Sequence, residues 1–126
     1  MRQFFGDNQT IEKEAISDLD KGFVSRFKSL VEERMKDAEL NVEDLGRNMG
    51  MSRVQLYRKL KSLTNYSPNE LLRQMRLKKA ASLLASSDMT VAEIAYEVGF
   101  SSPSYFTKCY KEQFGESPTE FLKRRG

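Results

Sequence analysis

The sequence predicts an all-α fold with two helix-turn-helix subdomains joined by a long central helix. Three observations lead to this prediction: apolar residues recur every three or four positions, one stretch of the chain occurs twice, and no run of β-branched residues is convincing as a strand of a parallel sheet. The length of 126 residues leaves room for one ordinary domain, or for two very small ones that share a central element.

The repeat covers residues 41–74 and residues 90–124. Both copies hold a glycine, a serine, a lysine-containing apolar stretch and the motif Ser-Pro-X-Glu, in that order. The offset between the copies is 49 residues at Gly50 and Gly99 and 50 residues further along, so one residue is inserted in the second copy near positions 102–104. An ordered match of this length is stronger evidence than any single motif.

Each copy predicts a short helix, a tight glycine turn and a second helix. Asn41 caps the first helix of one copy, and a capping box beginning at Thr90 starts that of the other. Gly50 and Gly99 are expected to end these helices in the left-handed conformation. The expected N-caps of the second helices are Ser52 and Ser101. This is the layout of a helix-turn-helix, whose second helix enters the DNA major groove; a generic helical hairpin is the alternative.

The motif Ser-Pro-X-Glu restarts a helix because Ser caps it, Pro suits its first position and Glu completes the capping box. The first such helix is expected to run from Pro68 to about Ser86, which is about 29 Å. One turn of DNA is about 34 Å long, so two recognition helices on this spacer could occupy successive major grooves. The expected buried stripe of this helix is Leu71, Leu72, Met75, Ala80, Leu83 and Leu84.

These elements divide the chain into four parts. Residues 1–20 are expected to be a tail, or a linker from an upstream domain that is missing from this chain. Residues 21–66 form the first subdomain, residues 67–87 the linking helix and residues 88–126 the second subdomain. A packing helix at the start of the first subdomain carries Phe23, Phe27, Leu30, Val31 and Met35 at helical spacing.

The charge of the chain is uneven. Residues 1–20 hold two cations and five acids, a net charge of −3. Since the whole chain has a net charge of +3, residues 21–126 have a net charge of +6. Residues 51–79 hold eight Lys or Arg against a single acid, Glu70. Such a cluster is a candidate footprint for an anionic polymer, and a solvated helix face is the plainer interpretation.

The composition argues against an enzyme. The chain has no histidine and one cysteine, which excludes Ser-His and Cys-His catalysis and an internal disulfide. It has no glycine-rich phosphate loop, and neither a cofactor nor a metal site is expected. No apolar run is long enough to cross a bilayer and no signal peptide is recognisable, so a cytoplasmic protein is expected.

Each second helix divides into a core face and a polar face. On the first, Leu56, Leu60 and Leu63 form the apolar stripe, and on the second the stripe is Phe106, Tyr110 and Phe114. Arg53, near the start of the first helix, is expected to contact a phosphate. The faces expected to read DNA are Val54, Tyr57, Arg58 and Lys61 on the first helix, and Ser104, Thr107, Lys108 and Lys111 on the second.

Three further residues of these helices are harder to assign. Cys109 matches Lys59 in the repeat, and we interpret it as a small, partly buried thiol, with a redox sensor as the alternative. Lys59 is expected to project sideways into solvent. Tyr105 either packs on the preceding helix or contacts a phosphate through its hydroxyl group.

The segments "MSRVQLYRKLKSLTNYSPNELLRQMRLKKAASLL" and "TVAEIAYEVGFSSPSYFTKCYKEQFGESPTEFLKR" resemble the DNA-binding domain of the AraC/XylS family of bacterial transcription regulators. The resemblance implies about seven helices and binding to promoter DNA, with RNA polymerase as a further candidate partner. It also implies an output domain of a response regulator or hybrid sensor kinase, driven by an upstream signalling domain, with a self-contained two-subdomain regulator as the alternative. The base contacts that it implies fall on Arg53, Val54, Tyr57, Arg58, Ser102, Ser104, Thr107 and Lys108.

Two other functions remain open from the sequence. The basic face could instead bind an acidic protein, which would make the chain a helical protein-interaction module. Binding of single-stranded RNA needs exposed aromatic side chains, and the four-residue spacing of Phe106, Tyr110 and Phe114 argues against it.

Overall fold

The computed structural model describes residues 17–125, and this part of the chain is built from seven α-helices without a strand. The helices are α2 (Asp18–Arg34), α3 (Val42–Asn48), α4 (Arg53–Thr64), α5 (Pro68–Ser86), α6 (Val91–Glu97), α7 (Pro103–Phe114) and α8 (Pro118–Arg125). The all-α fold with two helix-turn-helix units and a long central helix is confirmed.

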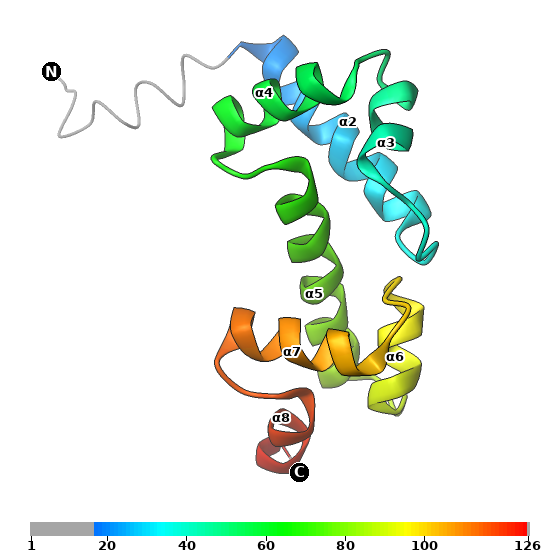
Figure 1. Ribbon diagram of the computed structural model, residues 1–126. Coiled ribbons are helices and arrows are strands. Elements are labelled where there is room, and N and C mark those ends of the chain that lie inside the picture. Colours follow the sequence, from blue (N-terminus) through cyan, green and yellow to red (C-terminus); the bar gives the residue numbers. More distant parts are fainter. Residues whose placement is uncertain (1–16, 126) are drawn as a thin grey trace, which may run out of the picture.

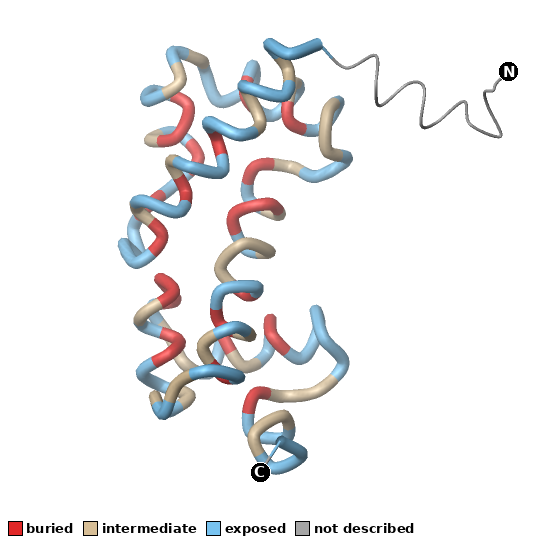
Figure 2. Tube along the Cα trace, turned by 180° about the vertical axis from the view of Figure 1, so that it is seen from behind, coloured by how far each residue is buried: buried red, intermediate tan, exposed pale blue. Residues whose placement is uncertain are grey.

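Helix α5 is the spine of the molecule (Figure 1). Helices α2, α3 and α4 pack on one another, and α4 contacts α5. Helices α6, α7 and α8 gather around the other end of α5, and each of them contacts it. The two units α3–α4 and α6–α7 therefore sit toward opposite ends of one helix, and buried residues recur along the length of α5 (Figure 2).

The helix starts follow the predicted caps with one exception. The Asn41 side chain accepts a hydrogen bond from the Asp44 amide, and Ser52, Ser67 and Thr90 each close a capping box. The N-cap of α7, however, is Ser102 and not Ser101. The residue inserted in the second repeat places a proline directly after Ser102, and proline suits the first helical position because it has no amide to leave unpaired.

Helix α2 begins at Asp18. The last residues of the segment 1–20, predicted to be a tail or linker, therefore belong to the first helix, and the Ser17 side chain caps it by accepting from the Asp20 amide at 3.1 Å. Residues 1–16 lie outside the part of the chain that the structure describes. The division of the chain at residues 66 and 87 stays a prediction.

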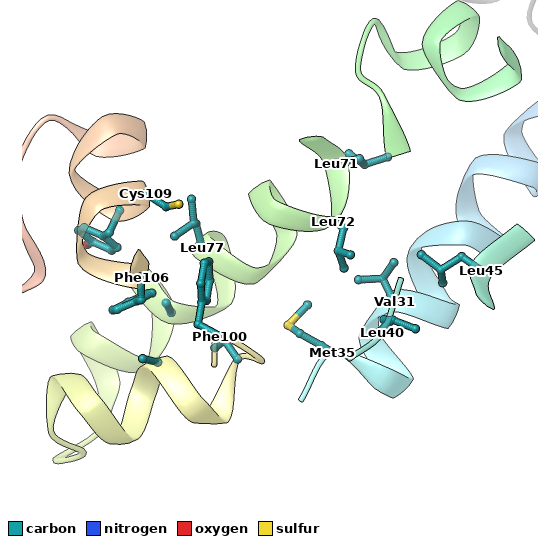
Figure 3. Packing of buried hydrophobic residues seen from close by; sticks show 14 of the residues in the cluster. Val31, Met35, Leu40, Leu45, Leu71, Leu72, Leu77, Phe100, Phe106 and Cys109 are labelled. Carbon is teal, nitrogen blue, oxygen red and sulfur yellow. The ribbon is translucent and has the colours of Figure 1, made fainter. Parts of the chain in front are cut away.

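The core differs from the predicted stripes in α4, α5 and α7. In α4, Leu63 was predicted in the stripe but is only half-buried. In α5, Leu77 is buried although the predicted stripe omits it, because several helices pack on α5 from different sides. Met75 and Leu83, which the stripe includes, are only half-buried. In α7, Phe114 is 40% exposed, so its assignment to the core was wrong. It is the last residue of α7, one turn beyond Tyr110, the last buried residue of that helix. Figure 3 shows the buried side chains that line both ends of α5.

Candidate nucleic-acid interface

The outer face of α4 presents polar and apolar side chains to solvent. Leu56 and Leu60 are fully buried and fix the helix on its subdomain. On the opposite side Val54 is 58% exposed and Tyr57 is 48% exposed. A shallow groove runs between this face and the start of α5, lined by Val42, Arg53, Val54, Tyr57, Arg58, Ser67, Pro68 and Asn69. Four of the five residues predicted on this helix are thus brought together along one groove.

Lys61, the fifth of these residues, lies one turn beyond that groove. Its Nζ atom is 4.0 Å from Glu70 Oε1, and both side chains are about half exposed to solvent. An exposed ion pair of this length is worth little, on the order of 0–1 kcal/mol. Lys61 can therefore leave Glu70 at little cost in free energy and bind another anion instead.

Helix α7 presents the second predicted face. Ser104, Lys108 and Lys111 are exposed, and Thr107 is half-buried at the edge of this face. Phe106 and Tyr110 are buried on the other side of the helix and hold it in place. Ser102 stands apart from this set because its hydroxyl oxygen accepts a hydrogen bond from the Tyr105 amide at 3.2 Å, so its side chain is engaged in capping α7.

The cations on these two faces differ from Lys59 in their surroundings. Within residues 17–125, Arg53, Arg58, Lys108 and Lys111 have no carboxylate within ion-pair distance. Lys59 was expected to point into solvent, but it lies 4.7 Å above the centre of the Phe23 ring and 3.8 Å from Asp20 Oδ1. It is a packing contact between α4 and α2. Its repeat equivalent, Cys109, lies in the core as a buried free thiol, whereas Lys59 is only half-buried.

Tyr105 lies between the two subdomains. Its side chain is 51% exposed, and its ring packs on Phe100 at a centroid distance of 6.0 Å. The Cys109 thiol beside its hydroxyl group raises the pKa of Tyr105, and the nearby Arg73 guanidinium acts in the opposite direction. The ring packs on Phe100, in the turn before α7, and the hydroxyl contact with a phosphate stays a prediction.

Two residues of α5 extend the surface and were missed by the sequence analysis. Asn69 lines the α4 groove and also a second depression, which includes Arg73, Ser101 and Tyr105. The two depressions adjoin at Asn69, so a continuous surface leads from α4 along α5 to the start of α7. The cationic cluster of residues 51–79 included Arg73, but only the packing of α5 decides which of its cations faces the recognition helices.

The remaining chemistry of this part of the chain is sparse. Among the described residues no three His, Cys, Asp or Glu side chains gather closely enough to hold a metal ion. No helix between residues 17 and 125 is both long and apolar enough to span a bilayer.

A helix-turn-helix domain family model matches residues 45–124, which is more than half of the chain. The chain belongs to the AraC-type helix-turn-helix family, a class of DNA-binding transcription regulators. The resemblance inferred from the sequence is confirmed, and so is the expectation that the chain is not an enzyme, because its family is one of transcription regulators.

Among its relatives, the chain is 37% identical over 109 residues to histidine kinase P4 of Formosa agariphila, an alignment that covers 86% of this chain and 8% of that protein. It spans only 37% of a second relative, the Msm operon regulatory protein of Streptococcus mutans. The chain is thus much shorter than the curated relatives it matches.

Two solved structures share the fold. The C-terminal domain of AraT, a response regulator from Geobacillus stearothermophilus, aligns with a TM-score of 0.77 and 28% identity over 88% of each chain. The DNA-binding domain of AdpA, a global transcriptional factor solved with a target DNA, aligns with a TM-score of 0.75 and 30% identity. That alignment covers 79% of this chain and 89% of the AdpA domain.

Proposed function

We propose that this chain binds double-stranded DNA at specific sequences and regulates transcription, with α4 and α7 entering successive major grooves. The proposal rests on one observation. Helices α4 and α7 each present an exposed face that carries cations, at equivalent positions of the repeat, and the 19-residue helix α5 connects them. The likeness to a DNA-binding domain solved with its target DNA supports it.

The side chains suggest how each helix would read a sequence. Arg58 can bind the O6 and N7 atoms of guanine with two hydrogen bonds, and Val54 can contact a thymine methyl group. Tyr57 can donate its hydroxyl hydrogen to a base edge or a phosphate. The face of α7 holds Ser104 and Thr107, whose hydroxyl groups can form hydrogen bonds with more than one kind of base, so α7 should contribute less sequence specificity than α4.

Arg53, Lys61, Lys108 and Lys111 are the proposed partners of backbone phosphates around these base contacts, and Arg73 extends the set along α5. Ser102, engaged in capping α7, would approach DNA through the helix terminus that it forms rather than through a free hydroxyl group.

We further propose that the chain is the output part of a two-component signalling protein. The matched relatives include a histidine kinase, and a matched structure is the C-terminal domain of a response regulator. An upstream signalling domain would then control access to promoter DNA in the cytoplasm, and RNA polymerase is the expected second partner at the promoter.

The first experiment selects genomic fragments that the purified chain retains in excess nonspecific DNA, and then measures affinity by fluorescence anisotropy. Arg58→Ala and Lys108→Ala should each weaken binding by about 5-fold or more, since one well-formed base or phosphate contact is worth about 1–3 kcal/mol. Lys78→Ala is the control, because Lys78 lines a separate depression with Lys28 and Glu32.

Circular dichroism must show that each variant keeps the helical content of the parent. If both variants bound the selected fragment as tightly as the parent, the assignment of the groove-facing residues would be wrong. If no genomic fragment were retained at all, the basic face would be better explained as a docking site for an acidic protein.

A further inference from the structure

The two subdomains touch each other directly at one corner beside α5. The segment after α2, residues 35–37, meets the turn between α6 and α7, residues 97–99. A Cβ atom on Gly99 would overlap the carbonyl oxygen of Met35, so the two backbones are in close contact. Lys36 Nζ is 3.2 Å from Glu97 Oε1 across the same corner. Figure 3 shows Met35 between the buried residues of the first subdomain and Phe100 of the second.

Arg76 of α5 fills this corner. Its Nη2 atom donates a hydrogen bond to the backbone oxygen of Asp37 at 2.8 Å. Its Nε atom is buried without a hydrogen-bond partner among the described residues and lies 2.8 Å from the position of a Cβ atom on Gly99. Burial lowers the pKa of Arg76, an effect that the Asp37 carboxylate opposes, and a guanidinium stays protonated under both influences.

The position of Arg76 in the helix is unusual for a cation. Leu72, Ala80 and Leu84 are buried at intervals of four along α5, and Arg76 occupies the remaining place in that series. An apolar residue there would leave the Asp37 carbonyl without this donor and would not join the two subdomains by a hydrogen bond. The guanidinium therefore contacts both subdomains from the helix that connects them.

We infer that this corner is a latch that fixes the orientation of the two subdomains, and that Arg76 and Gly99 are positioning residues for the distance between α4 and α7. Both subdomains pack on α5, and their direct contact at this corner adds a second restraint on how they are oriented relative to each other. The inference rests on the proposed function in one respect: a fixed distance between the helices would set the number of base pairs between the two half-sites.

The repeat provides a matched control. Gly50 and Gly99 are equivalent positions, and both have a positive φ, +69° and +93°. A Cβ atom on Gly50 would meet nothing within 4 Å, whereas one on Gly99 would collide with Met35 and Arg76. Gly50→Ala thus introduces only backbone strain, and Gly99→Ala introduces the same strain and also forces the corner apart. Arg76→Met removes the hydrogen bond without adding atoms at the turn.

The first measurement uses no DNA. Spin labels are attached through Ser62→Cys on α4 and Glu112→Cys on α7, both exposed positions, in a Cys109→Ala background. Double electron–electron resonance measures the distribution of distances between the two spin labels. This distribution should be narrow for the parent and for Gly50→Ala, and shifted or broader for Gly99→Ala and Arg76→Met. Identical distributions in Gly50→Ala, Gly99→Ala and Arg76→Met would overturn the latch.

The second measurement uses a selected two-part DNA site and versions with one base pair inserted between the halves. The parent and Gly50→Ala should lose at least about 10-fold in affinity on insertion, whereas Arg76→Met and Gly99→Ala should bind the original site more weakly and lose less on insertion. An unchanged loss in both latch variants would contradict the inference. If the parent bound no DNA, the proposed function would fail, and the resonance distances would still decide about the latch.

Discussion

The Glu116 carboxylate and the Arg124 guanidinium form a two-point ion pair that closes the turn between α7 and α8. Arg124 Nη2 lies 2.6 Å from Glu116 Oε2, and Arg124 Nε lies 3.3 Å from Glu116 Oε1. The Arg124 guanidinium also lies 5.1 Å from the centre of the Phe121 ring. Helix α8 is therefore joined to the turn after α7 by charge as well as by packing.

This ion pair predicts a loss of stability in acid. The hydrogen bond from Arg124 lowers the pKa of Glu116, and the bonds from Ser67 and Ser117 lower the pKa of Glu70 and Glu120. A carboxyl group whose folded-state pKa is lowered stabilises the fold above its unfolded-state value, near 4.5, and this contribution disappears as the pH falls through the folded-state pKa.

The melting temperature should thus be level near neutral pH and should fall below about pH 5. Thermal unfolding followed by circular dichroism from pH 7 to pH 3 checks it. Glu116→Gln should reduce the fall, since one of the three carboxyl groups no longer titrates. A Glu116→Gln protein with the full pH dependence of the parent would show that this pair does not contribute.

The two ends of the aromatic stripe of α7 should respond differently to truncation. Phe106 is fully buried, and its ring packs edge-on to Phe100 at 5.2 Å, so Phe106→Ala should destabilise the fold by about 3–5 kcal/mol. Phe114 is 40% exposed and contacts Tyr110 at 4.6 Å, so Phe114→Ala should cost no more than about 1.5 kcal/mol. Urea unfolding of both variants gives the two values, and equal losses would contradict the assignment of Phe114 to the surface.

The buried thiol should be unreactive in the folded protein. Cys109 is 4% exposed within the core, and a reagent must reach its sulfur atom to react. A chromogenic disulfide reagent should therefore modify it only in step with unfolding, and increasing urea should accelerate the reaction in parallel with the loss of helical signal. Rapid modification of the fully folded protein would revive the alternative of a redox sensor.

The surface between the recognition helices predicts a role for Arg73 in DNA affinity but not in DNA specificity. It is exposed, lies next to Tyr105, and has no ion-pair partner among the residues of the structure. Arg73→Ala should weaken binding to all sequences alike and reduce the slope of log affinity against log salt by about 1.

The control for this prediction is Lys78→Ala, about 140° around α5 from Arg73. It should leave the salt slope unchanged. A change of preference between selected fragments in Arg73→Ala, at constant salt slope, would indicate base contact in place of phosphate contact.

The local features of this fold could be predicted because each of them depends on neighbouring residues. Asn41, Ser52, Ser67 and Thr90 cap the helices they were expected to cap, since a cap needs only a side-chain oxygen three residues before the amide it accepts from. The repeat also located α4 and α7, because both copies hold the same glycine turn and helix start. The predicted N-cap of α7, Ser101, was wrong by one residue. Pro103 takes the first helical position, so the residue before it, Ser102, becomes the N-cap.

The tertiary structure decided what depends on residues far apart in the chain. Spacing alone grouped Phe114 with Phe106, but in the fold Phe106 is fully buried and Phe114 is 40% exposed. The sequence by itself determined the helices, the repeat and the polar faces, because helical periodicity and capping act within a few residues. Only the fold brought Arg76, Asp37 and Gly99 to one corner, because close approach between two backbones follows from how α5 orients both subdomains and leaves no local pattern in the sequence.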